Sequence, residues 1–431
     1  MESLDKLAKK CQNIKEDIFK EKRQMNEKKF LGAVCALSLA FNSIVLPMAD
    51  AAIRVPSAKK QESLALDSMN RHGNADGTSY EARQLSNILN NIAYRICDYS
   101  GLSITEYPYT NDNDYKSKIH PIHVSVESTN ANSYGGGHIF FGVKHAKNHF
   151  KLSNFEKPSL SQYDYFALEI SLAHEMGHNI LGHVYEPGNS EERENRHELE
   201  AEQQSIALTN NMPEGGWGLY MSSVARLLNR PDQNEAVIQS FGKKTNGKIT
   251  FKVVRGCGSG EDHFARLIST YYNASNGIQY EILSSNASGN NGWRRAEARE
   301  GNAYFGGQLA QCIAEGALTL DNLRIATLGD GMSDINMGGD CLLICRSPKL
   351  PNGYRVLFNL NGNPQQMLKM LKHAKANVSQ NTLAATQNRR IARMETMGGN
   401  WNSNDLKPNS EEHMRLVIEE AVAVAYDCAN R

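Results

Sequence analysis

The run Leu172-Ala-His-Glu-Met-Gly-His-Asn-Ile-Leu-Gly-His183 contains the pattern HExxH, formed by His174, Glu175 and His178. Residues four apart lie on one face of an α-helix, so both imidazoles can reach a single metal ion while Glu175 stands beside them. The preceding residues, from Tyr163 on, include neither Gly nor Pro and space their apolar side chains three or four apart, which predicts a helix. The stretch predicts a zinc hydrolase; the alternative is two histidines that share a helix by chance.

His183 is a further candidate donor, but helix geometry argues against it. At about 100° per residue its side chain would point roughly opposite to His174 if the helix continued, so we expect it at the helix end. The longer metzincin pattern needs Gly at position 181 and His at position 184, where this chain has Leu181 and Val184. The metzincin class is therefore excluded.

A third ligand should lie downstream, because a catalytic zinc normally takes three protein donors and leaves one position for water. Ser190 is a good N-cap for a helix rich in carboxylates. Glu198 and Glu202 share a face of that helix, whereas Glu200 projects about 200° away from Glu198. We assign Glu198 as the ligand and Glu202 as a carboxylate that orients a zinc-bound imidazole through its other nitrogen. The alternative is a solvated acidic face.

Three segments together resemble the HtpX and CAAX-prenyl-protease type of gluzincin metallopeptidases, including its periplasmic BepA-like members. Residues 132–141 look like the family's substrate-side strand, residues 172–183 like its zinc helix, and residues 195–202 like its third-ligand helix. The resemblance covers roughly residues 80–225. It implies a zincin-like metallopeptidase domain, mainly helical with a small sheet, that holds one Zn²⁺ per chain.

The resemblance also implies individual roles. His174, His178 and Glu198 would hold the zinc, and Glu175 would be the catalytic carboxylate. A strand beside a protease cleft can pair with an extended substrate, and an ordinary core strand has the same pattern. The expected substrate-binding residues are Gly136, Gly137, His138, Ile139 and Phe140.

This chain departs from the family at two places. The family usually has Asp four residues after its ligand Glu, where this chain has Glu202, one methylene longer. Family members also commonly carry a later His-Pro pair before a helix with an Arg. The nearest segment here, residues 406–415, lacks that pair, so no oxyanion-stabilising residue is named.

The 431 residues carry 47 basic and 47 acidic side chains, so charge predicts no general attraction to nucleic acid. At the amino end, Lys28 and Lys29 precede an apolar run, and Ala49-Asp-Ala51 supplies small residues with signal-peptidase spacing. We expect residues 1–51 to be a signal-peptide region with Met25 as the true start, and the protein to be exported, periplasmic or extracellular. The alternative is an uncleaved inner-membrane anchor with the catalytic domain outside the cytoplasm.

Six cysteines remain after signal cleavage: Cys97, Cys257, Cys312, Cys341, Cys345 and Cys428. An even set in an exported protein permits up to three disulfides, in any of 15 pairings. Cys341 and Cys345 would share one face of a strand. Disulfides or buried thiols are favoured there over a second metal site.

The chain as a whole is expected to be α+β. Residues 52–78 would be a linker, 79–229 the zinc metallopeptidase core, and 230–431 a C-terminal α+β region of unknown role whose last helix packs back on the core. Hydrophobic periodicity predicts helices at 80–99, 220–228, 263–271, 304–316, 364–376 and 409–429, and strands at 120–127, 137–143, 249–254, 278–283, 341–345 and 354–360.

The leading functional hypothesis is an exported zinc endopeptidase acting on polypeptides, with quality control of misfolded or envelope proteins implied by the resemblance. One alternative is an exported zinc-containing binding or assembly factor with little protease activity. Another is a zinc hydrolase of non-peptide amides. The sequence does not define an oligomeric state.

Overall fold

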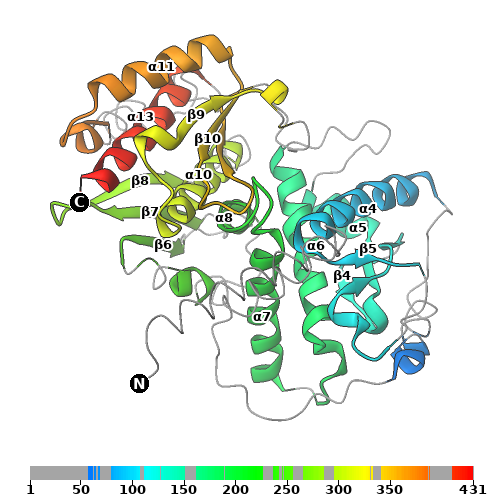
Figure 1. Ribbon diagram of the computed structural model, residues 1–431. Helices are drawn as coiled ribbons and strands as arrows, with labels where there is room; N and C mark the ends of the chain where they lie inside the picture. Colours follow the sequence, from blue (N-terminus) through cyan, green and yellow to red (C-terminus); the bar gives the residue numbers. More distant parts are fainter. Residues whose placement is uncertain are drawn as a thin grey trace, which may run out of the picture.

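The computed structural model describes an α+β protein (Figure 1). The described residues are 57–61, 63–64, 67, 79–106, 111–126, 128–150, 162–188, 190–226, 236–241, 245, 247–255, 266–285, 296–330, 332, 341–386, 388 and 410–430. The expected signal region lies outside them. None of the helices in this part of the chain combines the length and apolarity needed to cross a bilayer.

A small sheet lies beside the first long helix, α4 (Tyr80–Ser100). Its strands are β3 (His123–Ser125), β4 (Ala131–Ser133) and β5 (Ile139–Gly142), in the order β3-β5-β4. β5 is central, parallel to β3 and antiparallel to β4. β4 is therefore an edge strand within the described sheet.

Helices α6 (Gln162–Leu181) and α7 (Glu191–Thr209) pack side by side and carry the HExxH residues and the acidic residues. α6 ends at Leu181 and is followed by Gly182, whose φ of +72° is a left-handed conformation that favours glycine. α7 begins at Ser190, whose side chain accepts a hydrogen bond from the Arg193 amide at 3.3 Å. Gly177 permits close packing, because a Cβ there would lie 3.1 Å from the carbonyl oxygen of Ala201.

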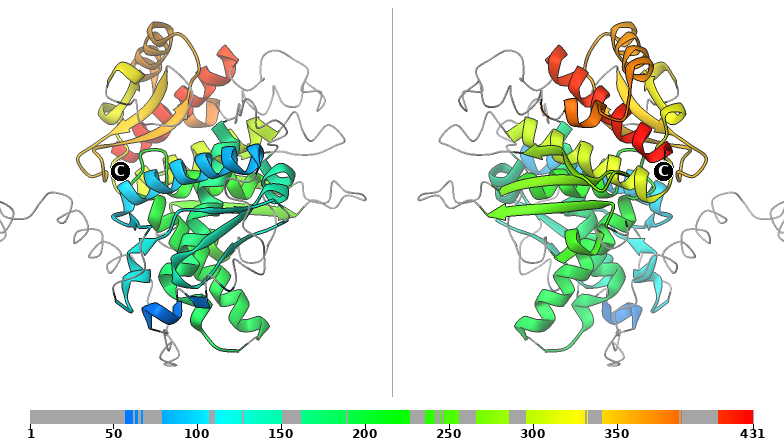
Figure 2. Two further views of the ribbon diagram at one scale, coloured as in Figure 1. Left: turned by 90° about the vertical axis from the view of Figure 1, so that its right-hand side faces the viewer. Right: turned by 90° about the vertical axis from the view of Figure 1, so that its left-hand side faces the viewer.

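The C-terminal elements form one end of the molecule, and the α6–α7 pair projects from the other (Figure 2). Helices α8 (Trp217–Arg226) and α10 (Ala296–Ala314) pack closely through glycines: a Cβ on Gly307 would lie 2.8 Å from the Cα of Gly218. The C-terminal region also contains β6 (Ile249–Arg255), β7 (Arg266–Asn273), β8 (Gln279–Ser285), β9 (Leu323–Ala326), β10 (Leu342–Arg346), β11 (Tyr354–Asn359), α11 (Pro364–Asn377) and α13 (Glu411–Ala429). The strands form two antiparallel sheets, in the orders β6-β7-β8 and β11-β10-β9.

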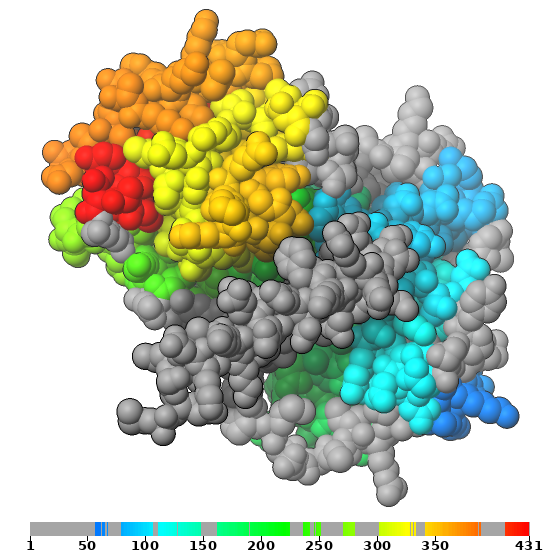
Figure 3. Space-filling view, viewed as in Figure 1, coloured from blue at the N-terminus to red at the C-terminus, as the bar shows by residue number. Residues whose placement is uncertain are grey.

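α6 is shared by two hydrophobic clusters. Phe166 and Ile170 belong to a larger cluster with α8, α10 and the C-terminal sheets. Leu172 and Met176 belong to a smaller one with α4 and the β3-β5-β4 sheet. The larger cluster crosses residue 230, so hydrophobic packing does not stop at the expected boundary. On the surface the yellow-to-red C-terminal residues still gather at the upper left, away from the blue and cyan residues at the right (Figure 3).

Most expected elements of the C-terminal region are present, but the helix expected at 263–271 is wrong. Residues 266–273 form β7, the central strand between β6 and β8. Their sequence, Arg-Leu-Ile-Ser-Thr-Tyr-Tyr-Asn, is rich in the β-branched and aromatic residues that favour strands, and two neighbours pair its backbone. The last helix, α13, packs against α11, and its Asp427 accepts a hydrogen bond from Tyr272 of β7.

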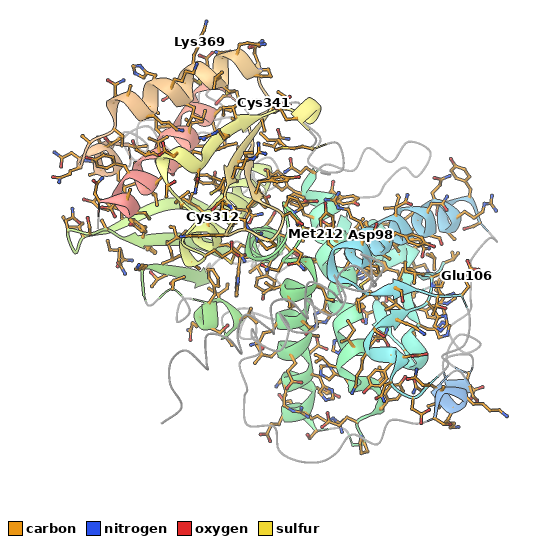
Figure 4. The ribbon with its side chains drawn as sticks, viewed as in Figure 1. Asp98, Glu106, Met212, Cys312, Cys341 and Lys369 are labelled. Carbon is orange, nitrogen blue, oxygen red and sulfur yellow. The ribbon has the colours of Figure 1, made fainter. Side chains whose placement is uncertain are left out.

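None of the five cysteines in the described residues is in a disulfide, so the expected bridges among them are not formed. Cys97, Cys312, Cys341 and Cys345 are buried instead, as small apolar side chains usually are. Figure 4 shows Cys312 on α10 and Cys341 just before β10. Cys257 lies outside the described residues.

Candidate metal centre

Three side chains predicted from sequence as ligands converge between α6 and α7. Nε2 of His174 lies 3.0 Å from Nε2 of His178 and 3.3 Å from Oε2 of Glu198, and Nε2 of His178 lies 3.7 Å from Oε1 of Glu198. A tetrahedral zinc with bonds of about 2.0–2.1 Å places its donors about 3.3 Å apart. These residues can therefore hold a metal ion, and they are the one such group in the described part of the chain.

The two helices supply this geometry locally. His174 and His178 are one turn apart on α6, and their rings meet edge-to-face with centroids 4.7 Å apart. The close packing of Gly177 against Ala201 places α7 near enough for Glu198 to reach both imidazoles. The third donor thus depends on helix packing as well as on sequence spacing.

Glu202 lies on the opposite side of the His174 ring. Its Oε1 is 3.5 Å from Nδ1 of His174. Burial alone would lower the pKa of His174, but the carboxylates of Glu202 and Glu198 outweigh it and hold that pKa well above its ordinary value. The negative charge of these carboxylates therefore favours a protonated His174 imidazole. A metal ion that binds through this imidazole would have to displace the proton.

Glu175 is the half-buried carboxyl beside the ligands. Burial raises its pKa to about 7, helped by Glu198 and Glu202, while His174 and a hydrogen bond from the Ser133 amide oppose the rise. A carboxylate whose pKa lies near neutrality is well matched to general-base work. The Ser133 contact also ties Glu175 to the edge strand β4.

His178 is backed by two residues that sequence reasoning did not place at the site. Its Nδ1 lies 3.0 Å from Nδ1 of His183, and Nε2 of His183 lies 3.0 Å from Oε2 of Glu200. His183 follows the end of α6, as expected, but the reversal at Gly182 turns its ring back toward the site. Glu200 points away from Glu198, as helix geometry predicts, and meets His183 there. Burial lowers the pKa of both histidines, that of His178 to about 3.

A cavity of about 470 Å³ opens over the three ligands. On one side it is lined by residues 130–133, which include β4, and on another by Tyr220, Ser223 and Val224 of α8. His145, from α5 (Val143–Phe150), also lines it, and its Nδ1 lies 3.2 Å from the Thr129 carbonyl oxygen. The cavity has polar walls from several elements.

The expected substrate-binding residues lie elsewhere. None of Gly136, Gly137, His138, Ile139 and Phe140 is among the residues that line this cavity. The backbone reverses at Gly136 and Gly137, with φ of +73° and +79°, so the segment is a β4–β5 hairpin rather than one strand. Ile139 and Phe140 occupy the central strand, which already has neighbours on both sides. The edge that faces the cavity is β4.

His138 belongs instead to a histidine cluster, defined by the buried His120 and His138 and the half-buried His123. Nδ1 of His138 lies 2.9 Å from Nε2 of His123, and its ring stacks on His120 with centroids 4.0 Å apart. Burial lowers the pKa of His120 to about 4 and that of His138 to about 2, so both are neutral near pH 7. The His120 amide also donates to the Gly137 carbonyl oxygen at 3.1 Å, which connects the cluster to the hairpin.

Tyr220 is a second cavity residue that sequence reasoning missed. Burial, with Glu202 nearby, holds its pKa well above the ordinary value, so the phenol keeps its proton and can donate a hydrogen bond. A helix was expected at 220–228, but nothing in its local sequence relates it to the HExxH residues 42 or more positions away. His413, in the segment 406–415 that is nearest to the resembled family's His-Pro segment, contacts Asn302 and Phe358 and does not line the cavity.

The comparisons with known proteins add no family to these observations. No protein-family model, curated protein or solved structure matches this chain. The resemblance of the three segments to gluzincin peptidases remains a prediction. The chemistry of the site must be inferred from its donors, their spacing and their electrostatics.

Proposed function

We propose that this protein is a zinc-dependent endopeptidase. One observation carries the proposal: His174, His178 and Glu198 lie at tetrahedral spacing on the floor of a cavity, with the carboxyl of Glu175 beside them. Two imidazoles and one carboxylate are a donor set that suits zinc, whereas Mg²⁺ and Ca²⁺ prefer oxygen donors throughout. The three protein donors leave a fourth position for water or substrate.

Bound zinc would polarise the scissile carbonyl and lower the pKa of a water molecule. Glu175 then accepts the proton of that water as it attacks the carbonyl, and returns it to the leaving amine. The raised pKa of about 7 suits both steps, because the same carboxyl must first take a proton and then release it. The Ser133 amide holds Glu175 on the side of the cavity that β4 borders.

The proposed substrate is an extended polypeptide. Within the described residues β4 is the edge of its sheet and borders the cavity, so its outward backbone groups, other than the Ser133 amide that donates to Glu175, can pair with a peptide without strong sequence demands. This moves the proposed pairing strand from residues 136–140 to residues 131–133. Across the cavity, Val224 and Ile170 supply apolar surface for a substrate side chain. The export expected from the amino-terminal residues would direct the activity toward proteins outside the cytoplasm.

The test compares the purified wild-type chain with Glu175→Gln and with Glu106→Gln. Glu106 is an exposed glutamate away from the site, labelled in Figure 4. Bound metal is measured by elemental analysis, and hydrolysis is followed on an unfolded protein with and without a chelator. We expect all three proteins to bind zinc, and only Glu175→Gln to lose chelator-sensitive hydrolysis, by about 10²–10⁴-fold.

Two outcomes would favour the other functional classes. Zinc binding without Glu175-dependent hydrolysis of protein would favour the binding or assembly factor. Hydrolysis of small amides that depends on Glu175, with no cleavage of protein, would favour a non-peptide amidohydrolase. A wild-type protein that binds no zinc would overturn the proposal altogether.

A further inference from the structure

We propose that His183 and Glu200 are positioning residues that fix the ring orientation and tautomer of His178 for metal binding. This inference rests on the proposed function, because it concerns the same metal centre. We call the three residues the His178–His183–Glu200 relay. It joins the last turn of α6, the turn after Gly182, and the exposed side of α7.

The hydrogen-bond directions in the relay follow from one condition. To bind a metal through Nε2, His178 must carry its proton on Nδ1. That Nδ1–H can donate to Nδ1 of His183, 3.0 Å away, only if the His183 proton is on Nε2. The Nε2–H of His183 then donates to Oε2 of Glu200 at 3.0 Å. The Glu200 carboxylate can only accept a hydrogen bond. The two hydrogen bonds together therefore favour the tautomer of His178 that binds a metal through Nε2.

His183 is itself held in place on several sides. Its side chain is 4% exposed, and its ring stacks on His197 with centroids 4.1 Å apart and planes within 4°. His197 bonds Glu186 through Nε2 at 2.5 Å, and Arg196 bonds the same carboxylate. Nη1 of Arg196 also lies 3.6 Å from Oε1 of Glu200. These contacts close a ring of side chains that leaves His183 little rotational freedom.

The two imidazole ligands are thus supported differently. His174 faces a carboxylate directly, with Oε1 of Glu202 3.5 Å from its Nδ1. The corresponding nitrogen of His178, Nδ1, reaches a carboxylate through the imidazole of His183. If His178 adopted the other tautomer, the proton on its Nε2 would point at the metal position and block it. The relay therefore contributes to metal affinity without contributing a donor.

The test uses His183→Leu, which removes the contact with His178, and His183→Gln, whose amide offers one acceptor and one donor as neutral imidazole does. His120→Leu is the matched control, because His120 is an equally buried histidine in the separate cluster under β5. Zinc affinity is measured by competition with a chelating dye. We expect His183→Leu to bind zinc about 10–100-fold more weakly, and His183→Gln and His120→Leu to stay within a few-fold of wild type.

A second readout requires no metal and no activity. Nitrogen-15 NMR of the imidazoles in the metal-free wild-type chain should report His178 with its proton on Nδ1, and Glu200→Ala should weaken that preference. Glu200 is partly exposed, so this variant does not open a cavity. Unchanged zinc affinity in His183→Leu, equal loss in His120→Leu, or an Nε2-protonated His178 in the wild type would each overturn the relay. If the wild type binds no zinc, the proposed function fails, and the NMR tautomer alone decides the relay.

Discussion

Nδ1 of His174 lies 3.5 Å from Oε1 of Glu202, while Nε2 of the same ring lies 3.3 Å from Oε2 of Glu198. Two glutamates one turn apart on α7 therefore hold the two nitrogens of one imidazole. The longer side chain of Glu202, where the resembled family has Asp, still reaches the ring. Glu198 can therefore donate to a metal ion, whereas Glu202 can only support the His174 ring.

Replacing these two glutamates should have unequal effects. Glu198→Ala removes a donor, so we expect zinc stoichiometry after dialysis against a weak chelator to fall well below one per chain. Glu202→Ala leaves all three donors, so stoichiometry should persist while affinity falls about 10–100-fold. Elemental analysis and dye competition measure the two quantities. Full zinc occupancy in Glu198→Ala would remove Glu198 from the ligand set.

Hydrolysis should depend on the ionised form of Glu175. Without metal its pKa is raised to about 7, and a bound dication favours the charged form and lowers that pKa. The rate constant kcat/KM should therefore rise with pH to a plateau, with an acid limb below pH 7. Initial rates from pH 5 to 8 on one protein substrate measure this limb. A flat profile over that range would contradict the assignment of Glu175 as the base.

Acid should destabilise the histidine cluster. The folded-state pKa of His120 is lowered to about 4, so below the unfolded value of 6.5 the unfolded chain binds more protons. The stability from this residue is present above pH 6.5 and is lost as pH falls toward 4, by about 3 kcal/mol in total. Urea unfolding at several pH values should show that His120→Gln flattens this loss. A stability difference from wild type that does not change between pH 7 and 4.5 would exclude the effect.

Glu169 should have the opposite pH dependence. It is fully buried, near Glu214, and 3.9 Å from Nε of Arg95. Burial, then Glu214, raises its folded-state pKa despite Arg95, so its contribution is present at low pH and is lost as pH rises through that pKa. Relative to wild type, Glu169→Gln should gain stability from pH 5 to 8, by at most about 1.4 kcal/mol per pH unit. Chemical denaturation checks this, with Glu106→Gln expected to show a constant difference.

The packing of α8 on α10 should tolerate no added methyl group. A Cβ on Gly307 would lie 2.8 Å from backbone atoms of Gly218 and Trp217, so Gly307→Ala should destabilise the fold by about 1–3 kcal/mol. Gly329→Ala is the control, because a Cβ there would meet only Oγ1 of Thr327, at 3.7 Å. Thermal unfolding compares the two. Equal stability of both variants would mean that the helices can separate without cost.

Local sequence patterns gave much of the secondary structure. The apolar spacing before His174 predicted α6, Ser190 predicted the start of α7, and the four-residue spacing placed both histidines on one face. These features depend on residues within one or two helical turns, so they can be read without knowing the fold. The prediction of a helix at 263–271, where the structure has β7, was wrong. A short run of apolar and aromatic residues suits either a helix or a strand until its neighbours are known.

The sequence by itself determined the helices that carry the candidate ligands and the chemistry of those ligands, because helix periodicity and donor type are local properties. Tertiary structure alone decided that β4 is the edge at the cavity, that Tyr220 joins its wall, and that His183 turns back to meet His178 and Glu200. Chain reversals at Gly136 and Gly182 and the close packing of α6 on α7 set those positions. Such contacts depend on how separate elements pack, which no local pattern specifies.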